Sequence, residues 1–136
     1  MPGETKHVNV RWVGGLRFEG GAPDGPTIPV DGDGIQSPSP VQQLLIAIAA
    51  CSGADVVSIL QKKRVDLQSL TVRVAGLRRE TFPRRYVSVH LVWEIAGAGA
   101  DETKARAAID LSLEKYCSVT QSLNPDIRIT YDVKLG

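Results

Sequence analysis

The sequence predicts an α+β fold in which an antiparallel sheet packs against one long, buried central helix. Three observations support this prediction. Alternating, strand-like segments occur near both ends and in the middle of the chain, a strongly apolar stretch of helical length covers residues 41–59, and strands and helices do not alternate regularly. A chain without repeated βαβ units is typical of the α+β class rather than of a doubly wound parallel sheet.

Length and composition narrow the possible functions. The 136 residues match the size of one domain, so we expect a single domain over residues 1–136. With 16 basic and 15 acidic side chains, the net charge of +1 favours neither nucleic acid nor a membrane as a partner. The N-terminus lacks a signal-peptide pattern, and the longest apolar run, residues 44–51, is too short to span a membrane. We therefore expect a cytoplasmic protein.

The N-terminal part of the chain predicts a β-hairpin. An alternating strand over residues 7–13 is followed by two consecutive glycines, which suit a tight turn. The returning strand, residues 16–20, carries Arg17 close to that turn. A long loop rich in Gly, Pro and Asp follows, and it includes one short strand at residues 27–30.

The central helix has a well-marked start. Ser39 is the expected N-cap, Pro40 occupies the first helical position, and Gln42 completes a capping box. The helical pattern continues to about Arg64. Because residues 41–59 are apolar around most of the circumference, we expect this helix to be buried on nearly all sides. One sheet in so small a domain cannot cover such a helix, so a homodimer is expected.

The second half of the chain predicts a second hairpin, a second helix and a final strand. The expected elements are strands over residues 70–77 and 86–95, a helix over 102–116 capped by Asp101, a short turn over 118–123 and a strand over 127–135. Residues 78–85 form the tip of the hairpin and contain four arginines, which more often belong to a solvated tip than to an anion site.

The chain has two cysteines, and each has a plain structural interpretation. Cys51 lies deep in the central helix between small residues, and free cysteines are among the most buried residue types. Cys117 falls at the end of the second helix. A zinc site would need these two with His7 and His90, but the spacing of a zinc motif is missing. In a reducing compartment, two cysteines are free thiols or a transient redox pair more often than a structural disulfide.

Together, three segments resemble the osmotically inducible protein C / organic hydroperoxide resistance (OsmC/Ohr) family of thiol peroxidases. These segments are SPVQQLLIAIAACSGADVVSIL, TVRVAGLRRETFPRRYVSVHLVWEI and EKYCSV, and the resemblance extends from about Trp12 to Leu135. The chain is most similar to the less characterised branch of the family, whose members are described only as redox proteins. The resemblance implies an OsmC-like fold and an intertwined homodimer with active sites at the subunit interface.

The resemblance also implies a reaction and its residues. Cys51 matches the peroxidatic cysteine, which attacks a hydroperoxide and becomes a sulfenic acid, and Cys117 matches the resolving cysteine, which then forms a disulfide with it. Arg17 matches the arginine that stabilises the thiolate. The family needs no metal and no bound cofactor, and dithiol reductants such as lipoyl groups on proteins regenerate the thiols.

One position departs from the family pattern. The characterised peroxidases hold their arginine with a glutamate at the position that Val41 occupies here, next to Gln42. Glu19 and Glu114 are the acidic candidates to take its place. Because of this departure, the sequence leaves an alternative open: a non-catalytic OsmC-like protein that binds an apolar ligand or a thiol partner at the dimer interface.

Overall fold

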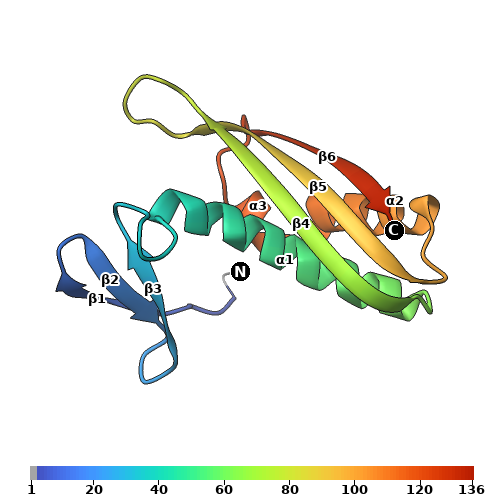
Figure 1. The fold of residues 1–136 in the computed structure, drawn as a ribbon, viewed down its shortest axis with the longest axis horizontal. Coiled ribbons are helices and arrows are strands. Elements are labelled where there is room, and N and C mark those ends of the chain that lie inside the picture. The colour runs from blue at the N-terminus through green and yellow to red at the C-terminus, as the bar shows by residue number, and fades with distance from the viewer. Residues whose placement is uncertain (1–2) are drawn as a thin grey trace. The chain divides into compact units, whose positions relative to one another are not determined.

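The computed structural model describes residues 3–136, and Figure 1 shows the arrangement of the elements within each part. The chain divides into two compact units, one ending at Leu44 and the other running from Leu45 to Gly136. Each unit has its own three-stranded sheet. The predicted α+β class is thereby confirmed, while the single domain over residues 1–136 stays a prediction.

The N-terminal unit contains an antiparallel sheet with the strand order β1-β2-β3. Its strands are β1 (Asn9–Gly14), β2 (Arg17–Gly21) and β3 (Thr27–Asp31). The three predicted strands are confirmed, with their ends shifted by one or two residues. Gly14 and Gly15 in the turn have φ angles of 120° and 55°, which side-chain-bearing residues rarely adopt, so the turn requires glycine.

A buried aspartate organises the turn that follows β3. Asp31 is the only buried residue among those described in the N-terminal unit. Its carboxylate accepts backbone N–H bonds from Asp33 at 2.9 Å, Ile35 at 3.2 Å and Gln36 at 2.9 Å. These bonds, the one from Gln36 above all, hold the pKa of the Asp31 carboxyl below its usual value, and the nearby Arg17 guanidinium acts in the same direction.

The long helix α1 (Pro40–Lys62) begins where the capping box predicts. The Gln42 N–H donates to Ser39 Oγ at 3.2 Å, and the Ser39 N–H donates to Gln42 Oε1 at 2.9 Å. The helix ends two residues earlier than expected, because Arg64 adopts a left-handed conformation with φ of 64°. The following N–H, from Val65, then bonds back to the Leu60 carbonyl at 3.0 Å, which closes the helix end.

Within the single chain, α1 is buried along one face only. The buried positions in α1 are Ile48, Ser52, Gly53, Val56 and Leu60. On the opposite side Ile46 is 52% exposed, and Ala50, Ala54 and Ser58 are exposed as well. By length and composition the helix is apolar enough to cross a membrane, with a mean hydropathy of 1.9. A core helix of a soluble protein has the same composition, and α1 here packs against a sheet.

The C-terminal unit has a mixed sheet with the strand order β4-β5-β6. Its strands are β4 (Asp66–Arg78), β5 (Tyr86–Ala98) and β6 (Arg128–Leu135). The hairpin of β4 and β5 is antiparallel, as predicted, but β6 pairs with β5 in parallel. The expectation of a purely antiparallel sheet is wrong here, because the helical segment between β5 and β6 provides the long crossover that a parallel pair requires.

The helical segment between β5 and β6 has three parts. They are α2 (Glu102–Leu111), the π-helical turn η1 (Ser112–Tyr116) and α3 (Ser118–Gln121). The predicted cap is confirmed, since Asp101 accepts the Lys104 N–H at 2.7 Å. The predicted continuous helix over residues 102–116 is interrupted, because its last turn is a π-turn that ends at Cys117.

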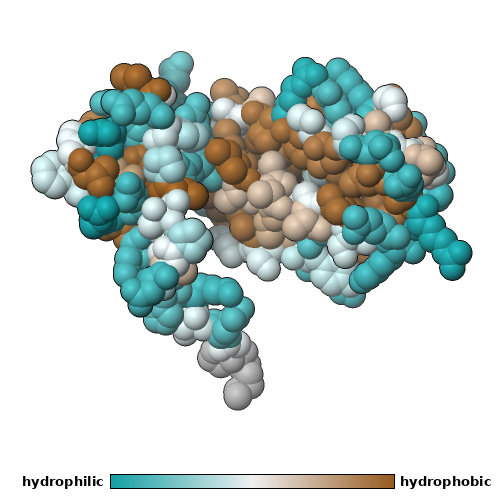
Figure 2. Space-filling view, turned by 60° about the horizontal axis from the view of Figure 1, so that its bottom comes forward, coloured by the Kyte–Doolittle hydropathy of each residue, from teal (hydrophilic) through white to brown (hydrophobic). Residues whose placement is uncertain are grey.

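The core of the C-terminal unit forms between α1, β5 and α2. Alternate residues of β5 point inward, and the fully buried ones include Leu91 and Trp93. They join Val56 and Leu60 of α1 and a face of α2 that contains two buried alanines and Ile109. Hydrophobic side chains also reach the surface, and Figure 2 shows a broad band of them across this unit.

Candidate functional site

The two cysteines come together inside the C-terminal unit. Cys51 lies in α1 and is half-buried, whereas Cys117 follows η1, has no exposed surface, and is the N-cap residue of α3. Both are free thiols, and they lie close enough for Cys51 to influence the pKa of Cys117. Two thiols that are far apart in sequence are therefore neighbours in the fold, and one of them is partly accessible from solvent.

The environment of Cys117 keeps its thiol protonated. Burial raises the pKa of Cys117 above its ordinary value, and the neighbouring Cys51 thiol raises it further. Hydrogen bonding by Thr120 acts in the opposite direction without cancelling the effect of burial. Because the thiolate is the nucleophilic form, the raised pKa lowers the reactivity of Cys117 in the resting protein.

Two hydrogen bonds to the Cys117 backbone hold this segment in place. The Cys117 N–H donates to the Ser112 carbonyl at 2.7 Å, the bond that closes the π-turn. Thr120 Oγ1 donates to the Cys117 carbonyl at 3.1 Å from the other side. π-turns within helices are uncommon and occur frequently at functional sites.

A buried polar network that the sequence analysis did not identify lies next to the cysteines. Ser52 and Ser112 have no exposed surface, and their Oγ atoms are 2.9 Å apart. Ser112 Oγ also donates to Asp55 Oδ2 at 2.8 Å. One signal was available in the sequence, since Ser112 occupies the apolar face of the second helix, where a hydroxyl needs a buried partner.

Arg17 lies in the N-terminal unit, at the start of β2. Its Nη1 donates to Gln36 Oε1 at 3.3 Å, and it pairs in register with Asp31 of β3. Glu19, an acidic candidate for holding this arginine, bonds to Arg11 at 2.8 Å instead. Within the N-terminal unit, Arg17 thus donates to the side-chain amide oxygen of Gln36, in the turn after β3.

The remaining polar candidates are engaged in ordinary surface contacts. His90 is half-exposed, as expected, and contacts Thr130 Oγ1 at 2.7 Å and Asp132 Oδ2 at 3.1 Å. At the hairpin tip, Arg78 and Arg79 donate to backbone carbonyls. Residues 3–136 contain no group of three potential metal ligands.

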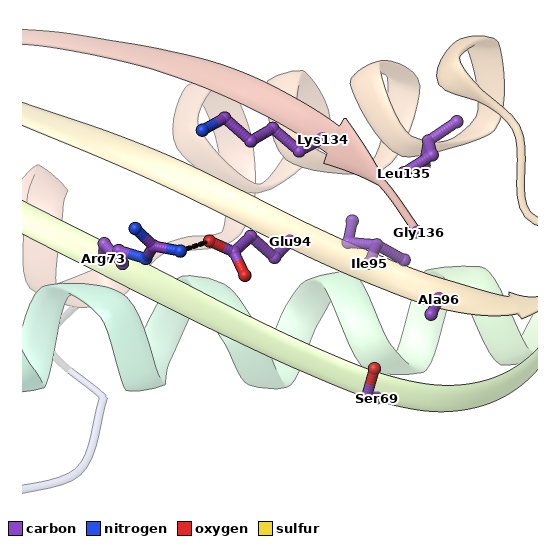
Figure 3. A pocket seen from close by; sticks show the side chains of 8 residues that line it. All are labelled: Ser69, Arg73, Glu94, Ile95, Ala96, Lys134, Leu135 and Gly136. Atoms are coloured by element: carbon purple, nitrogen blue, oxygen red, sulfur yellow. Dashed lines mark hydrogen bonds and ion pairs between the residues drawn. The ribbon is translucent and has the colours of Figure 1, made fainter.

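A pocket of about 380 Å³ lies at the sheet of the C-terminal unit and does not include the cysteines. Figure 3 shows its lining residues, with Arg73 of β4 and Glu94 of β5 paired to each other and Lys134 contributed by β6. The charges of Arg73 and Glu94 are paired with each other, so neither of these two side chains is free to direct a reaction in this pocket.

The α+β fold and the pair of neighbouring free thiols place this chain among small thiol-containing proteins. Comparison with known sequences identifies its family. Residues 31–132 match the family model "OsmC-like protein", so the chain belongs to the OsmC-like family. It is 39% identical to Protein YhfA of Escherichia coli K12 over 129 residues, which are 94% of this chain and 96% of YhfA.

Solved structures have the same fold. A hypothetical protein from Aquifex aeolicus VF5 is 30% identical, matches with a TM-score of 0.83, and the similarity covers 98% of both chains. More distantly, the organic hydroperoxide resistance protein OhrB of Bacillus subtilis matches with a TM-score of 0.62 at 16% identity, over 96% of this chain and 98% of OhrB. At that identity the match concerns the fold alone. The expected OsmC-like fold is confirmed.

Proposed function

We propose that this chain is a thiol-dependent peroxidase that reduces organic hydroperoxides with Cys51 and Cys117. Membership in the OsmC-like family supports a redox or hydroperoxide-resistance role in general. The observation that supports the more specific proposal is that two free thiols of unequal exposure are neighbours in the fold. A plain core cysteine needs no second thiol beside it.

In the proposed reaction, the Cys51 thiolate attacks the distal oxygen of the hydroperoxide. The O–O bond breaks, the alkoxide leaves and takes up a proton to become the alcohol, and Cys51 becomes a sulfenic acid. The Cys117 sulfur then attacks the Cys51 sulfur, water leaves, and the disulfide forms. A dithiol reductant, such as a lipoyl group on a protein, returns both cysteines to thiols through two exchange steps and is itself oxidised to a disulfide.

The different environments of the two thiols support this order of events. The half-buried Cys51 can meet a peroxide, whereas Cys117 has no exposed surface. The raised pKa of Cys117 keeps it protonated at neutral pH, so it does not compete for the peroxide. It loses its proton only when it attacks the sulfenic acid.

We assign the activation of Cys51 to Arg17. A guanidinium beside a thiol favours the thiolate, and it can also polarise the peroxide. The hydrogen bond from Arg17 to Gln36, together with the nearby Asp31 carboxylate, supplies an anchor for the arginine that does not need a glutamate at Val41.

We also propose that the protein is a cytoplasmic homodimer. The support is the face of α1 that the single chain leaves at the surface, including the exposed Ile46 and the alanines that follow it. A second copy that packs there would complete the burial of the most apolar helix in the chain.

The decisive experiment treats the reduced protein with one equivalent of cumene hydroperoxide and analyses it by mass spectrometry without reductant. We expect a disulfide between Cys51 and Cys117 in the wild type. In Cys117→Ser we expect a sulfenic acid on Cys51 that dimedone traps, and in Cys51→Ser no peroxide consumption. If peroxide leaves both thiols reduced, the peroxidase proposal fails, and the non-catalytic binding protein becomes the better hypothesis.

The role of Arg17 is tested with a matched arginine. Arg17→Gln should lower the rate of Cys51 oxidation at pH 7 by about tenfold or more, because it removes the cation proposed to stabilise the thiolate and to polarise the peroxide. Arg11→Gln, which removes an exposed arginine from the neighbouring strand, should leave the rate unchanged. Equal rates for both variants would remove Arg17 from the mechanism.

A further inference from the structure

In the buried network beside the cysteines, the donor and the acceptor of each hydrogen bond can be assigned. Ser112 Oγ donates its one proton to Asp55 Oδ2, at 2.8 Å. The 2.9 Å contact between the two serine hydroxyls therefore has Ser52 as the donor and Ser112 as the acceptor. Both hydroxyls are fully buried, and a buried hydroxyl that loses its partner is costly, so the three side chains hold one another in a single arrangement.

This network connects the two segments that bear the cysteines. Ser52 is the residue next to Cys51 in α1, and Asp55 lies one turn further along the same helix. Ser112 contacts α1 through its side chain and Cys117 through its backbone carbonyl, at 2.7 Å from the Cys117 nitrogen. Ser112 is therefore a direct mechanical link between the helix of one thiol and the backbone of the other.

We propose that Ser52, Asp55 and Ser112 form a clamp that positions Cys117 against Cys51 and thereby determines how readily the two form a disulfide. In this role they are positioning residues, not catalytic ones. The inference rests on the proposed function in one respect, namely that this pair of thiols is the one that becomes oxidised.

The geometry of a disulfide explains why such a clamp matters. The two sulfurs must approach to about 2.05 Å with the Cα atoms about 4.4–6.8 Å apart, so a small displacement of either segment opposes bond formation. A clamp that keeps the thiols together raises their effective concentration toward each other. Loosening the clamp should lower that concentration without touching either sulfur.

One end of the clamp is accessible for mutation without opening the core. Asp55 is only half-buried and lines a groove of about 490 Å³ together with Tyr116 and Leu111. Asp55→Ala removes the acceptor at a partly exposed helical position, where alanine favours the helix. Asp55→Asn retains an acceptor oxygen, so it serves as the conservative variant, and Ser58→Ala makes a comparable deletion at an exposed site of the same helix.

The experiment measures the equilibrium between the dithiol and the disulfide in buffers of reduced and oxidised dithiothreitol, using thiol trapping and mass spectrometry. The oxidised reagent accepts two electrons and two protons from the cysteines and opens to its dithiol, so no peroxide is required. We expect the equilibrium constant for disulfide formation to fall about tenfold in Ser112→Ala and Asp55→Ala. Asp55→Asn and Ser58→Ala should stay within about twofold of the wild type.

A urea titration of each reduced variant separates positioning from stability. A purely structural network would lower the free energy of unfolding in Ser112→Ala and leave the dithiol–disulfide equilibrium at the wild-type value. That result, or wild-type equilibrium constants in both Ser112→Ala and Asp55→Ala, would overturn the inference. So would a wild-type protein that forms no disulfide in oxidised dithiothreitol. A wild type that forms the disulfide here but ignores hydroperoxide would overturn the proposed function alone.

Discussion

The N-terminal unit leaves most of its large apolar side chains exposed, whereas the C-terminal unit buries a continuous core. In the first unit Val10 is 63% exposed and Trp12 is 64% exposed, and the one buried residue described there is the charged Asp31. In the second, Leu91 and Trp93 have no exposed surface. A three-stranded sheet without a packed face is only marginally stable by itself. The N-terminal unit is therefore stabilised mainly by its backbone hydrogen bonds and its turns.

This difference explains where the two kinds of candidate residue lie. The two thiols lie in the C-terminal unit, whose packed core can hold side chains in a fixed arrangement. Arg17, whose proposed role depends on its charge, lies in a hairpin of the N-terminal unit whose order depends on its turns. The predictions below test this contrast, beginning with the largest effect.

The largest contrast should appear when the same substitution is made in both units. Leu91→Ala should lower the free energy of unfolding by about 2–5 kcal/mol, because it opens a cavity in a core that cannot fully collapse. Leu16→Ala, at a side chain that is 55% exposed in the N-terminal unit, should change it by less than about 0.5 kcal/mol. Urea unfolding followed by fluorescence measures both. Equal losses would mean that the N-terminal unit is covered in solution.

A smaller effect concerns the reactivity of the thiols as pH changes. At neutral pH, iodoacetamide should modify Cys51 at least about tenfold faster than Cys117, because Cys117 is buried and its pKa is raised. Mass spectrometry of timed samples gives both rates. In urea the two rates should converge, and faster native modification of Cys117 would contradict the assignment of roles.

The raised pKa of Cys117 also has a consequence for stability. The folded state binds the thiol proton more tightly than the unfolded state does. The resulting stabilisation is fully present below the ordinary thiol pKa, about 8.5, and is lost as pH rises through the higher folded-state value. Cys117→Ser should remove this alkaline dependence.

The smallest expected effect is a pH-dependent change in the stability of the turn after β3. The pKa of Asp31 is lowered in the folded protein, so its contribution is present above the usual carboxyl pKa, about 3.9, and is lost as pH falls through the lower folded-state value. Hydrogen-exchange protection of the Ile35 and Gln36 amides should therefore decrease in acid. Asp31→Asn should weaken this protection at neutral pH, while Asp33→Asn, at an exposed position, should not.

Much of the fold was predictable because its signals are local. The capping box of Ser39 and Gln42, the Asp101 cap and the paired glycines of the first turn each satisfy backbone groups within a few residues. The π-turn at Ser112 was not predicted. Its hydrogen bond spans one residue more than that of an α-helical turn, and no particular residue type signals this difference. The parallel pairing of β6 was missed because strand direction depends on a distant partner.

The candidate site shows the same division. Cys51 and Cys117 could be selected from the sequence as a pair only through resemblance to a family, since each alone looks like a core residue. The Ser52, Asp55 and Ser112 network was not predicted, because its members come from two helices far apart in the chain. Glu19, one of the two acidic candidates for holding Arg17, binds Arg11 instead, because cross-strand pairing places Glu19 and Arg11 opposite each other.

The sequence by itself determined the element types, the start of the central helix and the identity of the two thiols, because caps, turn residues and periodicity act over a few neighbouring positions. Only the tertiary structure decided that the thiols are neighbours, that Cys51 is half-buried and Cys117 fully buried, and that Ser112 links their two segments. Those properties depend on packing between residues distant in the chain, and burial is what gives a thiol its pKa and a hydroxyl its need for a partner.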